Sequence, residues 1–166
     1  MFLAFSAAVA AQAAPAPPCS GPEYRALDFW VGEWDAEFAL PGGGTGRAAN
    51  RITRDEFGDC VIAEHFDQPD TGFAGASYSS YDRHKKKWVQ TWVDNSGGYI
   101  TLIGGPVEGR PHRFELVTLD PRGPQQVHFR MIWQDVKPDS FTWHWQARQT
   151  DGRWADSWVI RYKRRK

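Results

Sequence analysis

The dominant pattern beyond residue 40 is an alternation of apolar and polar residues with a period of two. In segment 127–133 every odd position is apolar, and in segment 141–145 every odd position is a large aromatic residue. Helical spacing of three and four positions does not recur there. Alternation of this kind is typical of strands that bury one face. The chain is therefore predicted to be all-β, with an inward face rich in aromatic side chains.

Ten segments of this kind can be placed between short breaks rich in Gly, Pro, Asn and Asp. They cover about residues 33–40, 46–54, 59–67, 73–82, 86–94, 98–104, 112–120, 125–135, 140–149 and 154–163. Consecutive strands joined by short turns predict an antiparallel up-and-down meander. Closing the meander removes its two exposed edges, so we expect a barrel of about ten strands.

A short helix is predicted before the first strand, over residues 22–30. Pro22 lies near its start and Glu23 lies in its first turn, and both positions favour a helix N-terminus. Gly32 ends it.

The composition indicates one compact domain. The 166 residues include nine Trp, ten Phe and five Tyr, which a disordered chain would not carry. Twenty basic and twenty acidic residues give a formal net charge of zero, which argues against the basic surface that nucleic-acid binding needs. We predict a leader over residues 1–18 and a single β-barrel domain over residues 19–166.

The leader resembles a secretory signal peptide. Residues 1–18 contain no charged residue, and an apolar run passes into small residues with a small-x-small cleavage pattern at Ala11-Gln12-Ala13. A basic n-region is missing, so a short disordered leader on a cytoplasmic protein is the alternative. The apolar run is shorter than the ~20 residues of a membrane span, so stable membrane insertion is not expected. We predict a periplasmic or secreted protein.

Two cysteines, Cys19 and Cys60, follow the proposed cleavage site. In an oxidising compartment an even pair is most simply one disulfide, and two buried thiols are the alternative. No CxxC or HxxxH spacing occurs and the five His residues are scattered, so no metal site is predicted.

The N-terminal motif gives a resemblance to known proteins. The step Gly32-x-Trp34 after a short helix, followed by a β meander, is similar to the calycin superfamily of lipocalins, fatty-acid-binding proteins and nitrobindins. Over about residues 19–163 the chain more closely resembles a family of uncharacterised bacterial secreted proteins regarded as calycin-like. The matching motifs are Leu27-Asp28-Phe29-Trp30-x-Gly32-x-Trp34, Asn50-Arg51-Ile52, Cys60-Val61-Ile62-x-Glu64, Trp88-x-Gln90-Thr91-Trp92-x-Asp94 and Gly104-Gly105.

The resemblance implies a fold, an exported location and, by analogy, a cavity for a small molecule. In lipocalin-like barrels the tryptophan of this motif closes one end of the barrel and packs against an arginine from a late strand. The resemblance therefore implies structural roles for Gly32, Trp34 and Arg161.

Ligand contacts are expected among the polar and aromatic residues of the inward face. Glu64 alternates with apolar residues of its strand, and Gln90 lies between Trp88 and Trp92. We predict Glu64 and Gln90 as polar contacts. The predicted walls are Trp92, Trp133 and Trp145. The alternatives are an exposed Glu64, a satisfied core amide at Gln90 and tryptophans that only fill the barrel.

The sequence therefore favours an exported protein that holds a small, partly apolar molecule in a barrel cavity. A nitrobindin-like haem protein is one alternative, but its candidate ligands His65 and His144 do not fall on the aromatic face. No cofactor is predicted otherwise. An enzyme is less favoured, because no GxSxG or Walker motif occurs and the neighbours Glu64 and His65 point to opposite faces. The third alternative is a filled barrel that binds another protein.

Overall fold

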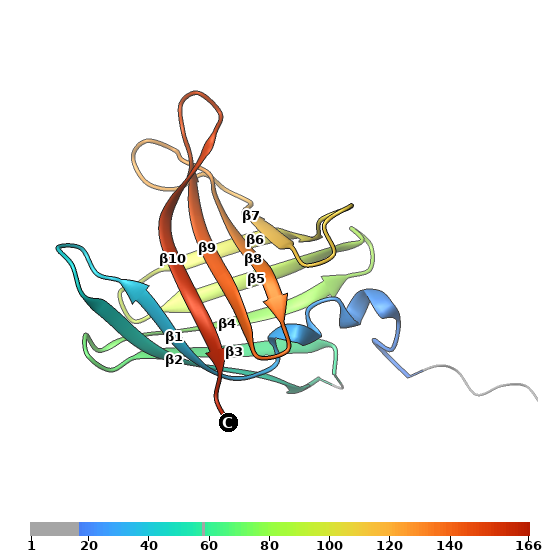
Figure 1. Cartoon of the computed structure of the whole chain (residues 1–166). Helices are drawn as coiled ribbons and strands as arrows, with labels where there is room; N and C mark the ends of the chain where they lie inside the picture. The colour runs from blue at the N-terminus through green and yellow to red at the C-terminus, as the bar shows by residue number, and fades with distance from the viewer. Residues whose placement is uncertain (1–16, 58) are drawn as a thin grey trace, which may run out of the picture.

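The structure, a computed structural model, describes residues 17–57 and 59–166. Ten antiparallel strands form one closed barrel, so the predicted all-β fold is confirmed (Figure 1). The strands are β1 (Gly32–Ala39), β2 (Thr45–Glu56), β3 (Val61–Gln68), β4 (Phe73–Asp82), β5 (Lys87–Asp94), β6 (Tyr99–Pro106), β7 (Phe114–Thr118), β8 (Phe129–Lys137), β9 (Ser140–Arg148) and β10 (Trp154–Arg164).

Each strand pairs with its neighbours in sequence, and β10 pairs with β1 to close the barrel. The closing pair runs from Trp34 opposite Arg164 to Phe38 opposite Ile160. Closure leaves no strand without a partner on either side, as the meander predicts. The proposed signal sequence up to residue 16 lies outside the described residues.

The predicted N-terminal helix is a pair of short 3₁₀ helices, η1 (Pro22–Arg25) and η2 (Asp28–Trp30). They lie across the end of the barrel at which β10 finishes (Figure 1). Leu27 and Trp30 are buried there against the inward side chains of the strands. We call this the plugged end of the barrel.

The largest difference from the predicted strands lies between β7 and β8. The predicted strand over residues 125–135 begins only at Phe129, and β7 is shorter than its predicted range. Arg122 and Val127 exchange backbone hydrogen bonds and form a small separate hairpin around Gly123, whose φ is +70°. Such a local turn takes residues 122–127 out of the barrel ladder. The other strand boundaries differ by at most two residues.

Trp34 fills the plugged end, but its cationic partner is Arg164. The guanidinium Cζ of Arg164 lies 4.0 Å from the centroid of the Trp34 ring. The prediction for Arg161 is wrong, because that side chain is exposed on the outer face. Side chains alternate along a strand, so Ile160 and Tyr162 put Arg164 on the inward face and Arg161 on the outward one.

Gly32 provides the space for this contact. Arg164 Nη1 donates to the carbonyl of Val31 at 2.9 Å, and Nη2 donates to the carbonyl of Phe29 at 3.3 Å. A Cβ atom at Gly32 would overlap Arg164 Nη1, and the φ of Gly32 is +140°. Both the backbone conformation and the space require glycine at this position.

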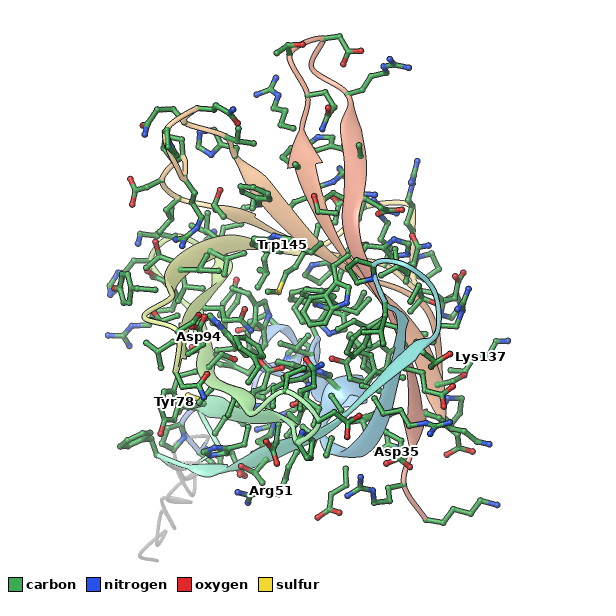
Figure 2. All side chains as sticks on the ribbon, turned by 90° about the vertical axis from the view of Figure 1, so that its left-hand side faces the viewer. Asp35, Arg51, Tyr78, Asp94, Lys137 and Trp145 are labelled. Atoms are coloured by element: carbon green, nitrogen blue, oxygen red, sulfur yellow. A yellow bond between two sulfur atoms is a disulfide. The ribbon has the colours of Figure 1, made fainter. Side chains whose placement is uncertain are left out.

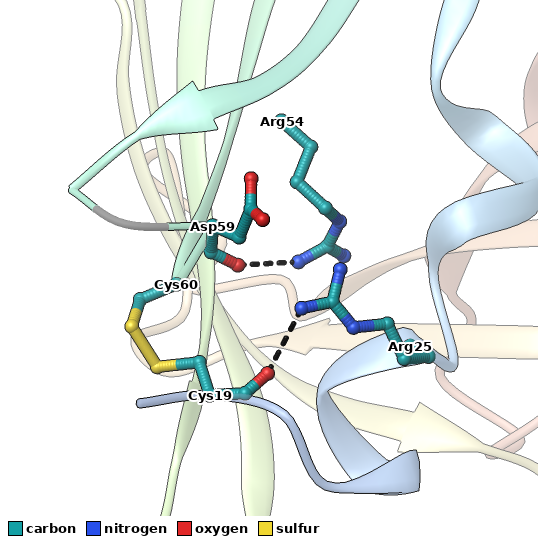
Figure 3. The surroundings of a disulfide bond; sticks show 5 residues. All are labelled: Cys19, Arg25, Arg54, Asp59 and Cys60. Carbon is teal, nitrogen blue, oxygen red and sulfur yellow. Dashed lines mark hydrogen bonds between the residues drawn. A yellow bond between two sulfur atoms is a disulfide. The ribbon is translucent and has the colours of Figure 1, made fainter. Parts of the chain in front are cut away.

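The predicted disulfide between Cys19 and Cys60 is present, with a sequence separation of 41 (Figure 3). It ties the segment before η1 to the turn before β3. Beside it, Arg25 Nη2 donates to the carbonyl of Cys19 at 3.0 Å, and Arg54 Nη1 donates to the carbonyl of Asp59 at 2.8 Å. Across residues 17–57 and 59–166, no helix is long and apolar enough to cross a membrane.

Candidate functional site

The barrel contains a cavity of about 200 Å³ at the end opposite the 3₁₀ helices. Figure 2 views the molecule from this end, with Trp145 and Asp94 labelled. The cavity is lined by Trp30, Glu64, Phe66, Phe73, Trp92, Asp94, Ile100, Met131, Trp133, Trp143, Trp145, Trp158, Ile160 and Tyr162. The predicted contacts Glu64, Trp92, Trp133 and Trp145 are all among them.

The burial of these residues defines a deep floor and an outer rim. We call the buried residues Glu64, Met131, Trp133, Ile160 and Tyr162 the floor of the cavity. We call the half-buried aromatic residues Phe73, Trp92, Trp143, Trp145 and Trp158 the rim. Alternation along the strands sends all of these side chains inward, and Trp30 of η2 reaches the cavity from the plugged end.

Flat aromatic faces line the β8–β9 side of the cavity. Trp145 stacks between Phe129, at a centroid distance of 5.2 Å, and Trp143, at 6.2 Å. The planes of both pairs lie within 5° of parallel. Each ring supports the next, so this side of the cavity is a packed aromatic wall.

On the other side, Phe66 holds the rim together. Its ring meets Phe73, Trp92 and Trp158 edge to face, at centroid distances between 6.1 and 6.4 Å. Gly75, opposite on β4, lets the Trp92 indole lie against the sheet, because a Cβ atom there would overlap the ring. The position of Trp92 therefore depends on a glycine two strand positions from its pairing partner Ser77.

Glu64 is the polar group of the floor, and its side chain is held by two neutral donors. Asn50 Nδ2 donates to Glu64 Oε1 at 2.8 Å, and Ser77 Oγ donates to Oε2 at 2.6 Å. Glu64 is only 7% exposed. Burial raises the pKa of Glu64 to about 7, and the two hydrogen bonds offset only part of that effect. Among the described residues, no basic side chain forms an ion pair with it.

Four strands build this cluster. Ser77 of β4 pairs directly opposite Glu64 of β3, whereas Asn50 reaches it from β2. Tyr162 of β10 lies on the far side of Asn50, which donates to its hydroxyl at 3.4 Å. Burial, and then the charge of Glu64, raise the pKa of Tyr162, so its hydroxyl stays protonated at physiological pH.

Gln90 does not belong to the cavity lining. It is buried on β5, and its Nε2 donates to Ser79 Oγ of β4 at 2.9 Å. The alternative of a core amide describes its position better than a ligand contact does. Gln90 precedes Trp92 on β5 and therefore lies nearer the plugged end of the barrel. This depth explains why Trp92 lines the cavity and Gln90 does not.

Asp94 is a cavity residue that the sequence-based prediction missed. It ends β5 and accepts hydrogen bonds from Ser96 Oγ, from Trp92 Nε1 at 2.9 Å and from the Gly98 amide at 2.9 Å. The hydrogen bond from Ser96, with those from Trp92 and the backbone, lowers the pKa of Asp94 to about 2. A carboxylate that caps the turn after a strand is a recognisable signal, since Asp94 is followed by Asn-Ser-Gly-Gly.

The sequence-based prediction also missed Trp143 and Trp158 as walls, although the period of two places both on the inward face. Trp133, which was predicted, is fully buried, and its Nε1–H has no hydrogen-bond partner within the described part of the chain. A buried donor without a partner is costly, so this group is available to an acceptor atom on a guest.

The two histidines considered for haem lie outside the cavity lining. His65 is exposed on the outer face of β3. His144 faces outward from β9, with its Nδ1 2.9 Å from Asp156 Oδ1. Within residues 17–57 and 59–166, no three His, Cys, Asp or Glu side chains are grouped to hold a metal ion.

Comparison with known proteins places the chain in a family. Residues 20–164 match the family described as "Protein of unknown function (DUF1579)". No curated protein matches. The crystal structure of Rv2717c from M. tuberculosis is similar, with a TM-score of 0.56 and 14% sequence identity, over 88% of this chain and 99% of that chain. At this identity the likeness shows the fold alone.

Proposed function

The chain belongs to the DUF1579 family, and we propose that it is an exported protein that binds a small, partly apolar molecule inside its barrel without covalent chemistry. The observation that carries this proposal is the cavity of about 200 Å³, walled by aromatic side chains and ending at one buried carboxyl group. Binding sites for small molecules are mostly apolar and contain a few placed polar groups.

The volume limits the size of the guest. An engineered cavity of about 150 Å³ holds benzene, and sites for drug-sized ligands start at about 300 Å³. A cavity of about 200 Å³ therefore suits a compact molecule with one or two fused rings or one branched head group. A long acyl chain would not fit within it.

The polar groups orient the guest. Glu64 offers a carboxyl group at the floor, and Trp133, also of the floor, offers an Nε1–H without a partner among the described residues. The tryptophans of the rim, which line the cavity, contact the apolar part.

The exported location is supported by the disulfide between Cys19 and Cys60, since such bonds persist in oxidising compartments. Mass spectrometry of the protein from the periplasm and from the culture medium tests this part. We expect a chain without the leader and two daltons lighter than the reduced form. A chain that keeps residues 1–18 and has two titratable thiols would contradict it.

Binding is tested with 2-naphthol, a planar neutral probe with one hydroxyl group. We expect saturable quenching of tryptophan fluorescence with one binding site, confirmed by calorimetry. Trp92→Ala removes a wall of the rim and should weaken binding at least tenfold.

The matched control is Trp154→Ala. Trp154 lies outside the cavity lining, where its ring contacts the guanidinium of Arg130. This variant should bind 2-naphthol within about twofold of the unaltered protein. The proposal fails if 2-naphthol does not saturate a site, or if both variants lose binding equally.

A further inference from the structure

The charge of the cavity lining has one sign. Its ionisable acids are Glu64 at the floor and Asp94 at the outer end of β5. No Lys, Arg or His belongs to the lining formed by the described residues. A site built for a carboxylate or phosphate would need a basic side chain, so the lining disfavours anionic guests.

Glu64 is a buried acid without a counter-ion. Its contacts, Asn50 and Ser77, are neutral donors, and it is 7% exposed. An ionised carboxylate in such surroundings is costly unless a cation lies beside it. The protein supplies no such cation among the residues described, so a positively charged guest is the partner that would complete the site.

The walls also favour positive charge. Aromatic faces carry negative electrostatic potential and attract cations within about 6 Å, most strongly when the ring is Trp. Trp92, Trp143, Trp145 and Trp158 line the cavity. Several tryptophans around one apolar space are typical of sites that hold alkylated ammonium groups.

We propose that the ligands of this barrel are organic cations, whose alkylated ammonium group lies among the tryptophans of the rim and whose charge is balanced by Glu64. The inference rests on the proposed binding function and names its ligand class. Asp94 adds a second negative charge at the rim, where it is already held by Ser96 and Trp92.

Binding of a cation should be coupled to ionisation of Glu64. From β2 the cluster receives Asn50 and from β4 Ser77, neither of which titrates. From β10 it receives Tyr162, whose raised pKa keeps it neutral, and the remaining acid of the lining, Asp94, stays ionised because its pKa is about 2. Glu64 is therefore the lining group that changes charge near neutral pH.

The direction of the pH effect follows from this. The pKa of Glu64 is about 7 in the free protein, so the carboxyl is about 1% ionised at pH 5 and mostly ionised at pH 8. A cation that needs the ionised form gains affinity as the pH rises, in proportion to the ionised fraction. The dissociation constant should fall up to about 100-fold from pH 5 to pH 8 and change little above that.

The test compares choline with 3,3-dimethyl-1-butanol, its uncharged isostere, by calorimetry on the mature protein. We expect choline to bind at least tenfold more tightly than the alcohol at pH 8. Binding at pH 6 should release close to one proton, measured as a dependence of the heat on the ionisation enthalpy of the buffer.

Variants locate the effect. Glu64→Gln keeps a side chain that can bond to Asn50 and Ser77 but removes the charge, so it should abolish the pH dependence and reduce the preference for choline at least fivefold. The charge of Asp94 remains in this variant. Asp67→Asn is the matched control, because Asp67 is exposed on the outer face of the same strand. It should leave both unchanged.

The outcomes separate the two proposals. The cation inference is overturned if choline binds no more tightly than 3,3-dimethyl-1-butanol at pH 8, or if the affinity for choline does not change with pH in the unaltered protein. The proposed binding function still stands in either case if the alcohol or 2-naphthol binds. If choline, the alcohol and 2-naphthol all fail to bind, the proposed function fails as well.

Discussion

The guanidinium Cζ of Arg164 lies over the indole of Trp34, 4.0 Å from its centroid, and so joins the last strand of the barrel to the first. The same guanidinium donates to the carbonyls of Val31 and Phe29. Trp34 in turn donates from Nε1 to the carbonyl of Trp30 at 2.8 Å. The guanidinium of Arg164 therefore provides hydrogen-bond donors for two backbone carbonyls around η2 and packs on Trp34 at the plugged end.

Replacing Arg164 should destabilise the barrel. We expect Arg164→Leu to lower the free energy of unfolding by about 2–3 kcal/mol, because the cation–π contact is lost and the carbonyls of Pro138, Val31 and Phe29 lose their donor. Arg161→Leu, three residues earlier on the exposed outer face, should change it by less than about 0.5 kcal/mol. Urea unfolding followed by tryptophan fluorescence measures both; equal losses would contradict the role of Arg164.

Gly32→Ala should act through the same contact. We expect a loss of about 2 kcal/mol, since the φ of +140° disfavours alanine and the new Cβ displaces Arg164 Nη1. In the Arg164→Leu background the cost of Gly32→Ala should be smaller, because the overlapping group is absent. A double-mutant cycle measures this coupling, and strictly additive effects would show that backbone strain alone is responsible.

The raised pKa of Glu64 makes the empty barrel less stable as the pH rises. The folded protein keeps the proton up to about pH 7, whereas the unfolded chain releases it near pH 4.5. The free energy of unfolding should therefore fall by about 3 kcal/mol between those values, at about 1.4 kcal/mol for each pH unit, and then level off. Glu64→Gln should remove this component, and a parallel pH profile in both proteins would contradict it.

Gly75→Ala should disturb the cavity from the sheet. The added Cβ overlaps the Trp92 ring, so the indole must turn away and the rim loses its contact with Phe66. We expect a loss of about 1–3 kcal/mol in stability and at least fivefold weaker binding of 2-naphthol. Ala76→Ser, the neighbouring position on the outer face, serves as the control and should bind normally.

Reduction of the disulfide should destabilise the protein mainly through the unfolded chain. With a sequence separation of 41 between Cys19 and Cys60, the expected loss is about 4 kcal/mol. Urea unfolding with and without dithiothreitol measures it, and the double variant Cys19→Ser/Cys60→Ser should reproduce the reduced value. A loss below about 1 kcal/mol would mean that the unfolded chain is already compact around this loop.

The barrel could be predicted because period-two alternation and turn residues are local properties of the chain. The same alternation placed Glu64, Trp92, Trp133 and Trp145 on the inward face, where the structure has them. The alternation also places Arg164 on the inward face and Arg161 on the outward face. Arg161 was the wrong partner for Trp34 because it was inferred from the resemblance to lipocalin-like barrels, against this alternation.

Gln90 and Asp94 show what alternation does not contain. Both lie on β5, where Gln90 is buried and Asp94 is half-buried, but only Asp94 belongs to the cavity lining. The depth of a side chain along the barrel axis depends on which end of the barrel the 3₁₀ helices cover (Figure 1). The 3₁₀ helices cover that end because Leu27 and Trp30 pack into it. The sequence of β5 contains no pattern that would predict this packing.

The sequence by itself determined the all-β class, the succession of strands and the inward aromatic face, because each follows from residues close in sequence. It favoured a disulfide between its two cysteines, and the structure shows the bond. The tertiary structure alone decided the surroundings of Glu64. Its partners Ser77 and Asn50 lie 13 and 14 residues away in the sequence, and Tyr162 lies 112 residues from Asn50. The register of the strands and the closure of β1 on β10 bring these residues together. Their side chains bury the carboxyl group of Glu64 and provide no counter-ion for it.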